Sequence, residues 1–421
     1  MKELSVPQKK SADALARALL AWMFFLYPIS LALNKTMNDA LSLALFVFSC
    51  GYLLLRPAAL KAACARSRWL WVLALCLPLL LAVTQHFFLT RPLHLRDMDE
   101  VSRFVACIPV YFAVLILRPS IRPFLWGCLL FLLVTVPLMF WHLHVLGLSR
   151  GVLPNGFLGI IPHTSLALIL GTLALTLLVQ PDGSLRRRWL AVPMIICTLG
   201  VPLLTQTRSG LLLALCLGTL VWLLLPNKRI KVLLYGAAAA LVFIGVVVSN
   251  SALWSRSDQT LAEIEHYVSE DNVAMTSTTT RIELWRFAGK MFAAHPLIGI
   301  GNHRFQAELV TYQAAGETPS DLAMYTHPHN EFLKSAAEGG IIGVLALLLL
   351  YFVPLDAARR RYFRAPSAAN PALPIIVVST GFFIAGLVDV VLIWRPTIMF
   401  YGLVISLLLA HMDSAEKPVA G

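Results

Sequence analysis

The side chains best suited to proton transfer in this 421-residue chain lie in a short polar stretch, YTHPHN, at residues 325–330. An almost wholly apolar, glycine-rich segment follows it. A neutral imidazole can take a proton from a hydroxyl group, and Asn330 or the carboxylate after it could orient the ring. His329 is therefore a candidate general base. The alternative is a histidine that only lies at a polar–apolar boundary, followed by Gly340 and Gly343 as positions of close helix packing.

The same stretch contains a His-x-His pair, His327 and His329, which by itself is a weak indication of a metal site. No clear third ligand accompanies the pair, and all seven cysteines precede residue 217 without paired metal spacing. The sequence also lacks a Walker motif, a dinucleotide fingerprint and a hydrolase elbow. We therefore expect no metal site and no nucleotide cofactor.

Two arginines are candidates for binding a phosphate group. Arg208 lies in TQTRSG, on a very short connection between two apolar runs, and Arg281 opens a helical pattern in TSTTTRIELW. A guanidinium group stays charged at any relevant pH and binds phosphate through two parallel hydrogen bonds. The alternatives are an arginine that snorkels at a helix end for Arg208, and a solvated residue at a helix start for Arg281.

Ionisable side chains within apolar segments need a reason, because insertion scales put their cost at a helix centre at about 2.5–3.5 kcal/mol. Asp389, in GLVDVVLIW, is the clearest case. It could serve the site, or it could form only a helix–helix hydrogen bond or an ion pair with Arg395. His163 follows Pro162, and loosened backbone that satisfies the imidazole is the simpler explanation there. The mixed charges at residues 96–103 are expected to form an interface rim.

The elements that carry these residues are membrane helices. Hydrophobic residues make up 58% of the chain and charged residues 13%, so a water-soluble surface cannot be assembled from it. The apolar runs are continuous rather than alternating, and each is about long enough to cross a 30 Å hydrocarbon core as a helix. The composition predicts an all-α polytopic membrane protein with about twelve spans. They lie near 16–33, 39–55, 69–88, 103–117, 124–146, 157–179, 189–205, 210–225, 232–249, 336–355, 372–391 and 397–411.

The basic residues predict the orientation of these spans. If alternate connections and both termini are cytoplasmic, that side holds 21 of the 34 Lys and Arg residues, which agrees with the positive-inside rule. The net charge of +12 thus reports membrane topology and not nucleic-acid binding. We expect three parts: spans one to nine at 1–249, an external loop domain at 250–335 with helical patterns at 258–270 and 280–294, and the last three spans with a cytoplasmic tail at 336–421.

Taken together, the residues resemble the O-antigen ligases, within the broader group of O-antigen polymerases and O-linked oligosaccharyltransferases. The family signature is a histidine, then Asn, Ser or Gln, nine residues, a glycine, two residues, and Gly, Thr or Tyr. His329, Asn330, Gly340 and Gly343 match it. Further matches are the Arg-Ser pair at 208–209, the T-R-x-x-x-W element at 280–285 and HPLIGIG at 295–301.

The resemblance implies transfer of O-antigen polysaccharide from undecaprenyl diphosphate to a hydroxyl of the lipid A-core oligosaccharide. The expected place is the periplasmic face of the inner membrane of a Gram-negative bacterium, and the expected fold is similar to the C-type glycosyltransferases. The implied roles are general base for His329 and diphosphate binding for Arg208 and Arg281, without a metal or cofactor. Supporting positions are Asn330, Asp389, Gly340 and Gly343.

Two other functions stay open. An O-antigen polymerase or a protein O-oligosaccharyltransferase would share the donor, the histidine and the arginines, and would differ only in the acceptor. A twelve-span transporter would share the topology, but it should carry polar or broken helices deep in the membrane and inverted repeats. The polar groups here gather at one face of the membrane, which favours an enzyme at that boundary.

Overall fold

The computed structural model describes residues 6–89, 95–147, 158–178, 185–224, 277–317, 320–367 and 369–414. Within these ranges the chain forms α-helices and one 3₁₀ helix, and no strand occurs among them. The span predicted at 232–249 and the helical pattern predicted at 258–270 lie outside the described residues. The helices are α1 (Val6–Leu33), α2 (Lys35–Leu54), α3 (Pro57–Cys64), α4 (Trp69–Phe88), α5 (Leu95–Leu117), α6 (Arg122–His144), α7 (Ile160–Leu178), α8 (Leu185–Leu204), α9 (Arg208–Leu224), α12 (Ser277–Ala294), α13 (Phe305–Ala314), η1 (Ser320–Met324), α14 (Glu331–Arg364), α15 (Leu373–Val388) and α16 (Arg395–Ser414).

Most of these helices are apolar enough to lie in a membrane. By length and composition, seven of the described helices could cross one, namely α1, α2, α4, α5, α6, α14 and α16. Apolar segments of α7, α8, α9 and α15 are shorter. These eleven helices coincide with eleven of the predicted spans, and the prediction of an all-α polytopic membrane protein is confirmed. The reason is local: a long apolar run can satisfy its backbone in a bilayer only as a helix or in a closed barrel.

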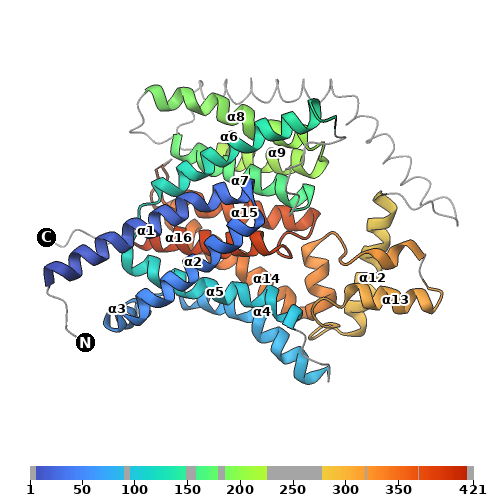
Figure 1. The fold of residues 1–421 in the computed structure, drawn as a ribbon. Coiled ribbons are helices and arrows are strands. Elements are labelled where there is room, and N and C mark those ends of the chain that lie inside the picture. The colour runs from blue at the N-terminus through green and yellow to red at the C-terminus, as the bar shows by residue number, and fades with distance from the viewer. Residues whose placement is uncertain are drawn as a thin grey trace.

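The centre of the bundle is formed by α15 and α16 (Figure 1). The side chains of α16 are buried on almost every side, as expected for a helix that is apolar all round. It packs against α5, α15, α2 and α14. Tyr401 contributes an aromatic contact and a hydrogen bond. Its ring lies 4.9 Å from that of Phe382, and its hydroxyl donates a hydrogen bond of 2.6 Å to the carbonyl of Leu350.

At one end of the bundle, α12 and α13 project beyond the membrane-type helices, and the first turns of α1 lie at the opposite end (Figure 1). The prediction of a helix at 280–294 is confirmed by α12. On this helix Leu284, Phe287 and Met291 are buried, whereas Trp285 is 39% exposed. These three follow a helical period and pack with α13, η1 and the first turns of α14 in a small core of their own.

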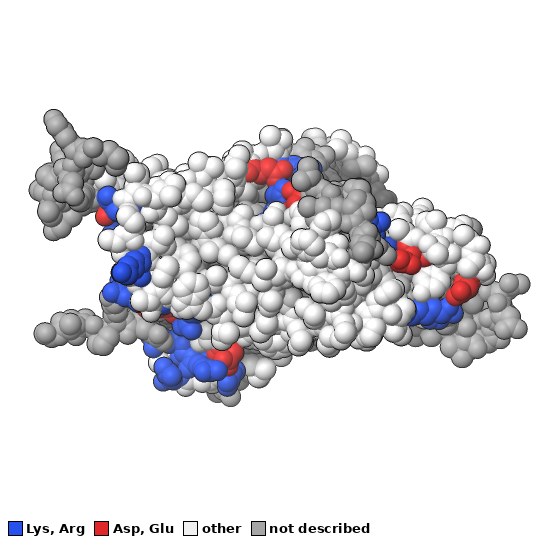
Figure 2. Space-filling view, turned by 90° about the horizontal axis from the view of Figure 1, so that it is seen from below, with Lys and Arg blue, Asp and Glu red and all other residues white. Residues whose placement is uncertain are grey.

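The charged side chains on the surface also differ between these two ends of the molecule. Figure 2 shows a broad uncharged area on one face, with Lys and Arg side chains gathered at the end opposite α12 and α13. Exposed large apolar side chains, such as Trp22, Leu43 and Leu73, suit contact with lipid. The concentration of basic residues at the end where α1 begins agrees with the orientation expected from the positive-inside rule.

A glycine interrupts α14 and turns its first part away from its axis. Gly340 has φ 61° and ψ −157°, so α14 consists of two helical parts joined at a kink. A Cβ atom at Gly340 would lie 2.4 Å from the carbonyl carbon of Leu297. The turn around Leu297 fills this space and accepts backbone hydrogen bonds there, including the one from Ile341 N–H to Pro296 O at 2.8 Å. The close approach expected at this glycine is therefore made by the HPLIGIG backbone and not by a neighbouring membrane helix.

Gly343 likewise allows a close approach of the backbone. A Cβ atom at this position would lie 2.7 Å from the carbonyl oxygen of Ser335, across the kink in α14. The side-chain contact closest to it is Leu81 of α4, at 3.5 Å. Both signature glycines thus allow the kink and the close packing that set the position of the first part of α14, which carries the polar stretch at its start.

Candidate active site

His329 lies immediately before α14, where the polar stretch meets the helix bundle. Its backbone is left-handed, with φ 50°, a conformation that is uncommon for residues other than glycine but tolerated by histidine. Asn330 is the N-cap of α14, because its Oδ1 accepts hydrogen bonds of 3.0 Å from the N–H groups of Phe332 and Leu333. Its Nδ2 donates to Leu387 O at 2.8 Å. Asn330 therefore fixes the loop and does not orient the imidazole.

The group that orients His329 is Asp389. Its Oδ1 lies 3.0 Å from His329 Nδ1, and the Asp389 side chain is only 8% exposed. Asp389 follows α15 as its C-cap, and the same oxygen accepts the N–H of Val390 at 2.9 Å. A carboxylate at Nδ1 holds the ring proton on that nitrogen, which leaves Nε2 as the proton acceptor. The suggested ion pair between Asp389 and Arg395 is absent, since Arg395 Nε lies 2.8 Å from Asp99 Oδ2.

His327 is a neighbour of this pair. Its ring centroid lies 4.6 Å from that of His329, and its Nδ1 accepts the backbone N–H of His329 at 3.3 Å. This hydrogen bond helps to hold the left-handed turn. Burial, together with the adjacent His329 ring, lowers the pKa of His327 to about 4. His327 is consequently neutral near pH 7.

Arg281 and Trp285 bring α12 onto the same loops. Arg281 is half-buried, and its Nη1 donates a hydrogen bond of 3.3 Å to the carbonyl of Val388, the residue before Asp389. Trp285, one turn further along α12, donates from Nε1 to the carbonyl of Pro328 at 2.9 Å. The two ends of the T-R-x-x-x-W element thus contact the loops that carry Asp389 and His329.

Arg208 lies at the same end of the bundle. It is exposed and begins α9. The turn before it is joined to the start of α7, where Thr164 and Thr205 form a hydrogen bond of 3.0 Å. The start of α7 in turn faces the loop after Asp389, because a Cβ atom on Gly159 would lie 3.4 Å from Trp394. Arg208 therefore lies at the same end of the bundle as Asp389. Arg281, by contrast, contacts the loop that carries Asp389 directly.

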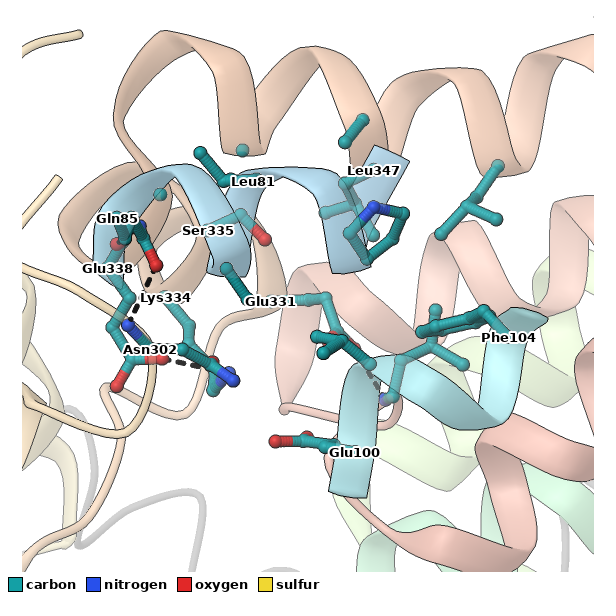
Figure 3. Close-up of a pocket in the computed structure, with 18 residues that line it drawn as sticks. Leu81, Gln85, Glu100, Phe104, Asn302, Glu331, Lys334, Ser335, Glu338 and Leu347 are labelled. Atoms are coloured by element: carbon teal, nitrogen blue, oxygen red, sulfur yellow. Dashed lines mark hydrogen bonds and ion pairs between the residues drawn. The ribbon is translucent and has the colours of Figure 1, made fainter. Parts of the chain in front are cut away.

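A pocket of about 100 Å³ opens beside the first part of α14, between that helix, α4 and α5 (Figure 3). Its polar lining includes Glu100, Lys334 and Glu338, and Lys334 Nζ lies 2.9 Å from Glu338 Oε2. Its deeper lining is apolar and includes Leu347 and Phe104. The mixed charges predicted as a rim thus include a buried carboxylate, Glu100, that lines a cavity.

Residues 193–348 match the family model described as O-Antigen ligase. An O-antigen ligase of Escherichia coli (strain K12) is 25% identical over 225 residues, which are 50% of this chain and 49% of that protein. These matches support the O-antigen ligase family. The chain thus matches about half the length of this relative. The resemblance predicted from the motifs is confirmed, and the O-antigen ligase match contains Arg208, Arg281 and His329.

Outside the O-antigen ligase match, the loop after α15 supplies the two partners that complete the site. One is Asp389, described above. The other is a pair of backbone N–H groups, those of Val391 and Leu392, which donate to Glu331 Oε2 at 2.7 and 2.8 Å. Glu331 is buried and fastens this loop to the start of α14. In the sequence, this carboxylate is a candidate only for orienting the imidazole, and its position beside Asn330 is the only signal.

His163 is placed apart from these contacts, inside α7. It is buried, and its ring lies 6.0 Å from that of Phe131. Among the described residues, its Nε2 atom has no hydrogen-bond partner, so the expected satisfaction by loosened backbone is not found. Pro162 lies within the first turn of α7, where a proline is tolerated and does not break the helix.

Proposed function

We propose that this protein transfers O-antigen polysaccharide from undecaprenyl diphosphate to a hydroxyl group of lipid A-core oligosaccharide. The observation that carries the proposal is the His329–Asp389 pair at 3.0 Å, with Arg281 bonded to the residue before Asp389. A base, its orienting carboxylate and a cation for a leaving diphosphate thus meet at one boundary of the bundle. The match to the O-antigen ligase family supports this type of transfer.

In the proposed reaction, the acceptor hydroxyl attacks the anomeric carbon of the donor in one step, with inversion. The new bond joins the acceptor oxygen to that carbon, the bond from the carbon to the diphosphate oxygen breaks, and the hydroxyl proton passes to His329 Nε2. Asp389 accepts the hydrogen bond from Nδ1 and stabilises the imidazolium ion as it forms. A positioned general base typically accelerates such a step by about 10²–10⁴-fold.

The arginines are proposed to stabilise the departing undecaprenyl diphosphate. Arg281 uses one N–H group on the Val388 carbonyl, and a guanidinium group has five N–H groups in all. The remaining donors allow Arg281 to bind phosphate oxygens in the bidentate manner. Arg208, at the same end of the bundle, would supply a second guanidinium group to the diphosphate. Each such donor is worth about 2.7–4 kcal/mol in a site that excludes water.

The pocket beside α14 suits the lipid-linked substrates. Its polar part is formed by Glu100, Lys334 and Glu338 on the side of the external loops, and its apolar part continues along α4 and α14. A molecule with a sugar or phosphate head group and a hydrocarbon chain could place the head group in the polar part and the chain along the apolar part. Glu331 lines the pocket and lies two residues after His329, so an occupant would be close to the proposed base.

We place this site at the periplasmic face of a Gram-negative inner membrane, with both termini in the cytoplasm and residues 250–335 as the external domain. Support comes from α12 and α13, which lie opposite the basic end of the molecule (Figures 1 and 2). Labelling of single cysteines with a membrane-impermeant maleimide tests the orientation in spheroplasts. A cysteine at Ala293, exposed on α12, should react, and one at Phe363, exposed near the end of α14, should not.

The decisive experiment offers the purified protein one lipid-linked O-antigen donor and three separate acceptors. These are lipid A-core oligosaccharide, a lipid-linked repeat unit and a pilin peptide. We expect product only with lipid A-core oligosaccharide. Elongation of the repeat unit would identify a polymerase, and glycosylation of the peptide would identify a protein O-oligosaccharyltransferase.

A further inference from the structure

Tertiary folding brings a third metal-ligating side chain to the His-x-His pair. The candidate ligand atoms of His327, His329 and Asp389 all lie within 4.8 Å of one another. Among the described residues, they are the one group of three or more His, Cys, Asp or Glu side chains whose candidate ligand atoms lie this close together. The sequence places the two histidines next to each other, but Asp389 is separated from His329 by 60 positions and meets them only in the folded chain.

The three groups have the chemistry and access that a divalent transition metal requires. Two imidazoles and one carboxylate, with an open position for water, are a common ligand set for zinc. Zinc–nitrogen and zinc–oxygen bonds of about 2.0–2.1 Å place tetrahedral ligands roughly 3.3 Å apart, so modest rotations of the side chains would close the present spacing. Asp389 Oδ1 and His329 Nδ1 are already 3.0 Å apart. The His329 side chain is 26% exposed, which gives an ion access from the loop side.

The two arginines near Asp389 bind other groups, which leaves its carboxylate accessible to such an ion. The neighbouring cation, Arg281, donates to the carbonyl of Val388 and not to the carboxylate. Arg395, six residues after Asp389, is paired with Asp99 at 2.8 Å. The carboxylate therefore has the imidazole and one backbone N–H as its polar contacts at Oδ1, and both can be rearranged by a stronger ligand.

We propose that His327, His329 and Asp389 form an inhibitory site for Zn²⁺. An ion bound to His329 Nδ1 and Asp389 would displace the Nδ1 proton, which would pass through solvent to Nε2, so that Nε2 could no longer accept the proton of the acceptor hydroxyl. The metal would not take part in the transfer; it would stop it by occupying the base and its carboxylate. The inhibition rests on the proposed function, whereas zinc binding by these residues does not.

The test measures zinc binding and ligation separately on tag-free protein in detergent. Binding is followed by isothermal titration with ZnCl₂ alone, and ligation is measured over the same zinc concentrations as a fraction of the zinc-free rate of each variant. The test variant is His327→Asn. An asparagine side chain can accept the N–H group two residues later, so it keeps the hydrogen bond to His329 while it removes an imidazole ligand.

A second His-x-His pair provides a matched control. His142 and His144 lie in the last turn of α6, and His144 is exposed. His144→Asn removes an imidazole from the same motif without touching the proposed site. Loss of an outer-shell partner already weakens metal binding by about 10–100-fold, so loss of a ligand in His327→Asn should weaken it by at least roughly tenfold.

We expect one zinc ion per chain, weaker binding in His327→Asn and unchanged binding in His144→Asn, with inhibition following the binding curve of each protein. Zinc binding that is the same in wild type and His327→Asn would overturn the site. Binding at these residues without inhibition would overturn the inhibitory role. If no transferase activity is found with any acceptor, the titrations still decide whether the metal site exists, and the failure then belongs to the proposed function.

Discussion

Replacement of Asp389 by asparagine is the sharpest test of the proposed base. The side chain keeps its shape and an oxygen near His329 Nδ1, but it loses the charge that stabilises the imidazolium ion. At an effective dielectric constant of about 20, unit charges about 4 Å apart attract by about 4 kcal/mol. Since the His329 side chain is 26% exposed, we take about 3 kcal/mol as the loss, which is roughly 10²-fold in kcat.

The amide can make the defect larger. If its NH₂ group donates to Nδ1, the ring proton moves to Nε2, and Nε2 can no longer accept the proton of the hydroxyl. The estimate is therefore a lower bound for Asp389→Asn. The assay is the initial rate of ligation with saturating donor and lipid A-core oligosaccharide, and we expect the KM for the donor to change little because the carboxylate does not contact the diphosphate.

Asp356→Asn is the matched control. Asp356 pairs with Arg359 and Arg360 on an exposed part of α14, and surface ion pairs are worth about 0–1 kcal/mol. This variant should ligate at the wild-type rate. Asp389→Asn within about threefold of the wild-type kcat would refute the argument. So would a further large loss when Asp389→Asn is added to His329→Ala, since residues that act as one unit are not additive.

Three other substitutions test the remaining parts of the site. His329→Ala should abolish useful ligation while the protein stays in the membrane, which blotting of membrane fractions checks; near-normal ligation would exclude the base assignment. Arg281→Lys keeps the charge but loses the planar fork, so kcat should fall about tenfold or more, whereas Arg286→Lys, on the exposed face of the same helix, should ligate normally. Gly340→Ala should lower the melting temperature in detergent, because a Cβ atom would lie 2.4 Å from the Leu297 backbone at φ 61°; Gly289→Ala, where nothing lies within 4 Å, should leave it unchanged or raise it.

The membrane helices could be predicted from the sequence because the cause of each one is local. A continuous apolar run determines both insertion and helix formation, and eleven predicted spans coincide with described helices on that basis. The helix at α12 was likewise visible in its pattern. Its buried face was not, because Trp285 suits burial by composition but is instead used for a hydrogen bond to Pro328.

The chemistry of the site depends on contacts between segments that are distant in the chain. His329 and Arg281 could be named as candidates from their residue types, but their partners could not. Asp389 faces His329 only because α15 ends beside the start of α14, and Glu331 and Asn330 fasten those two ends together. The same packing fills the space at Gly340 with the backbone near Leu297 and brings His327 to a carboxylate.

The sequence by itself therefore determined the class of the protein, the helical spans and the residue types available at one boundary. These follow from transfer of side chains into a bilayer, which acts on each segment separately. Only the tertiary structure decided which carboxylate meets His329, which backbone groups Arg281 and Trp285 bind, and which backbone fills the space beside the glycines. Those outcomes depend on the angles and positions at which helices pack, and such packing is a property of the whole bundle rather than of any one segment.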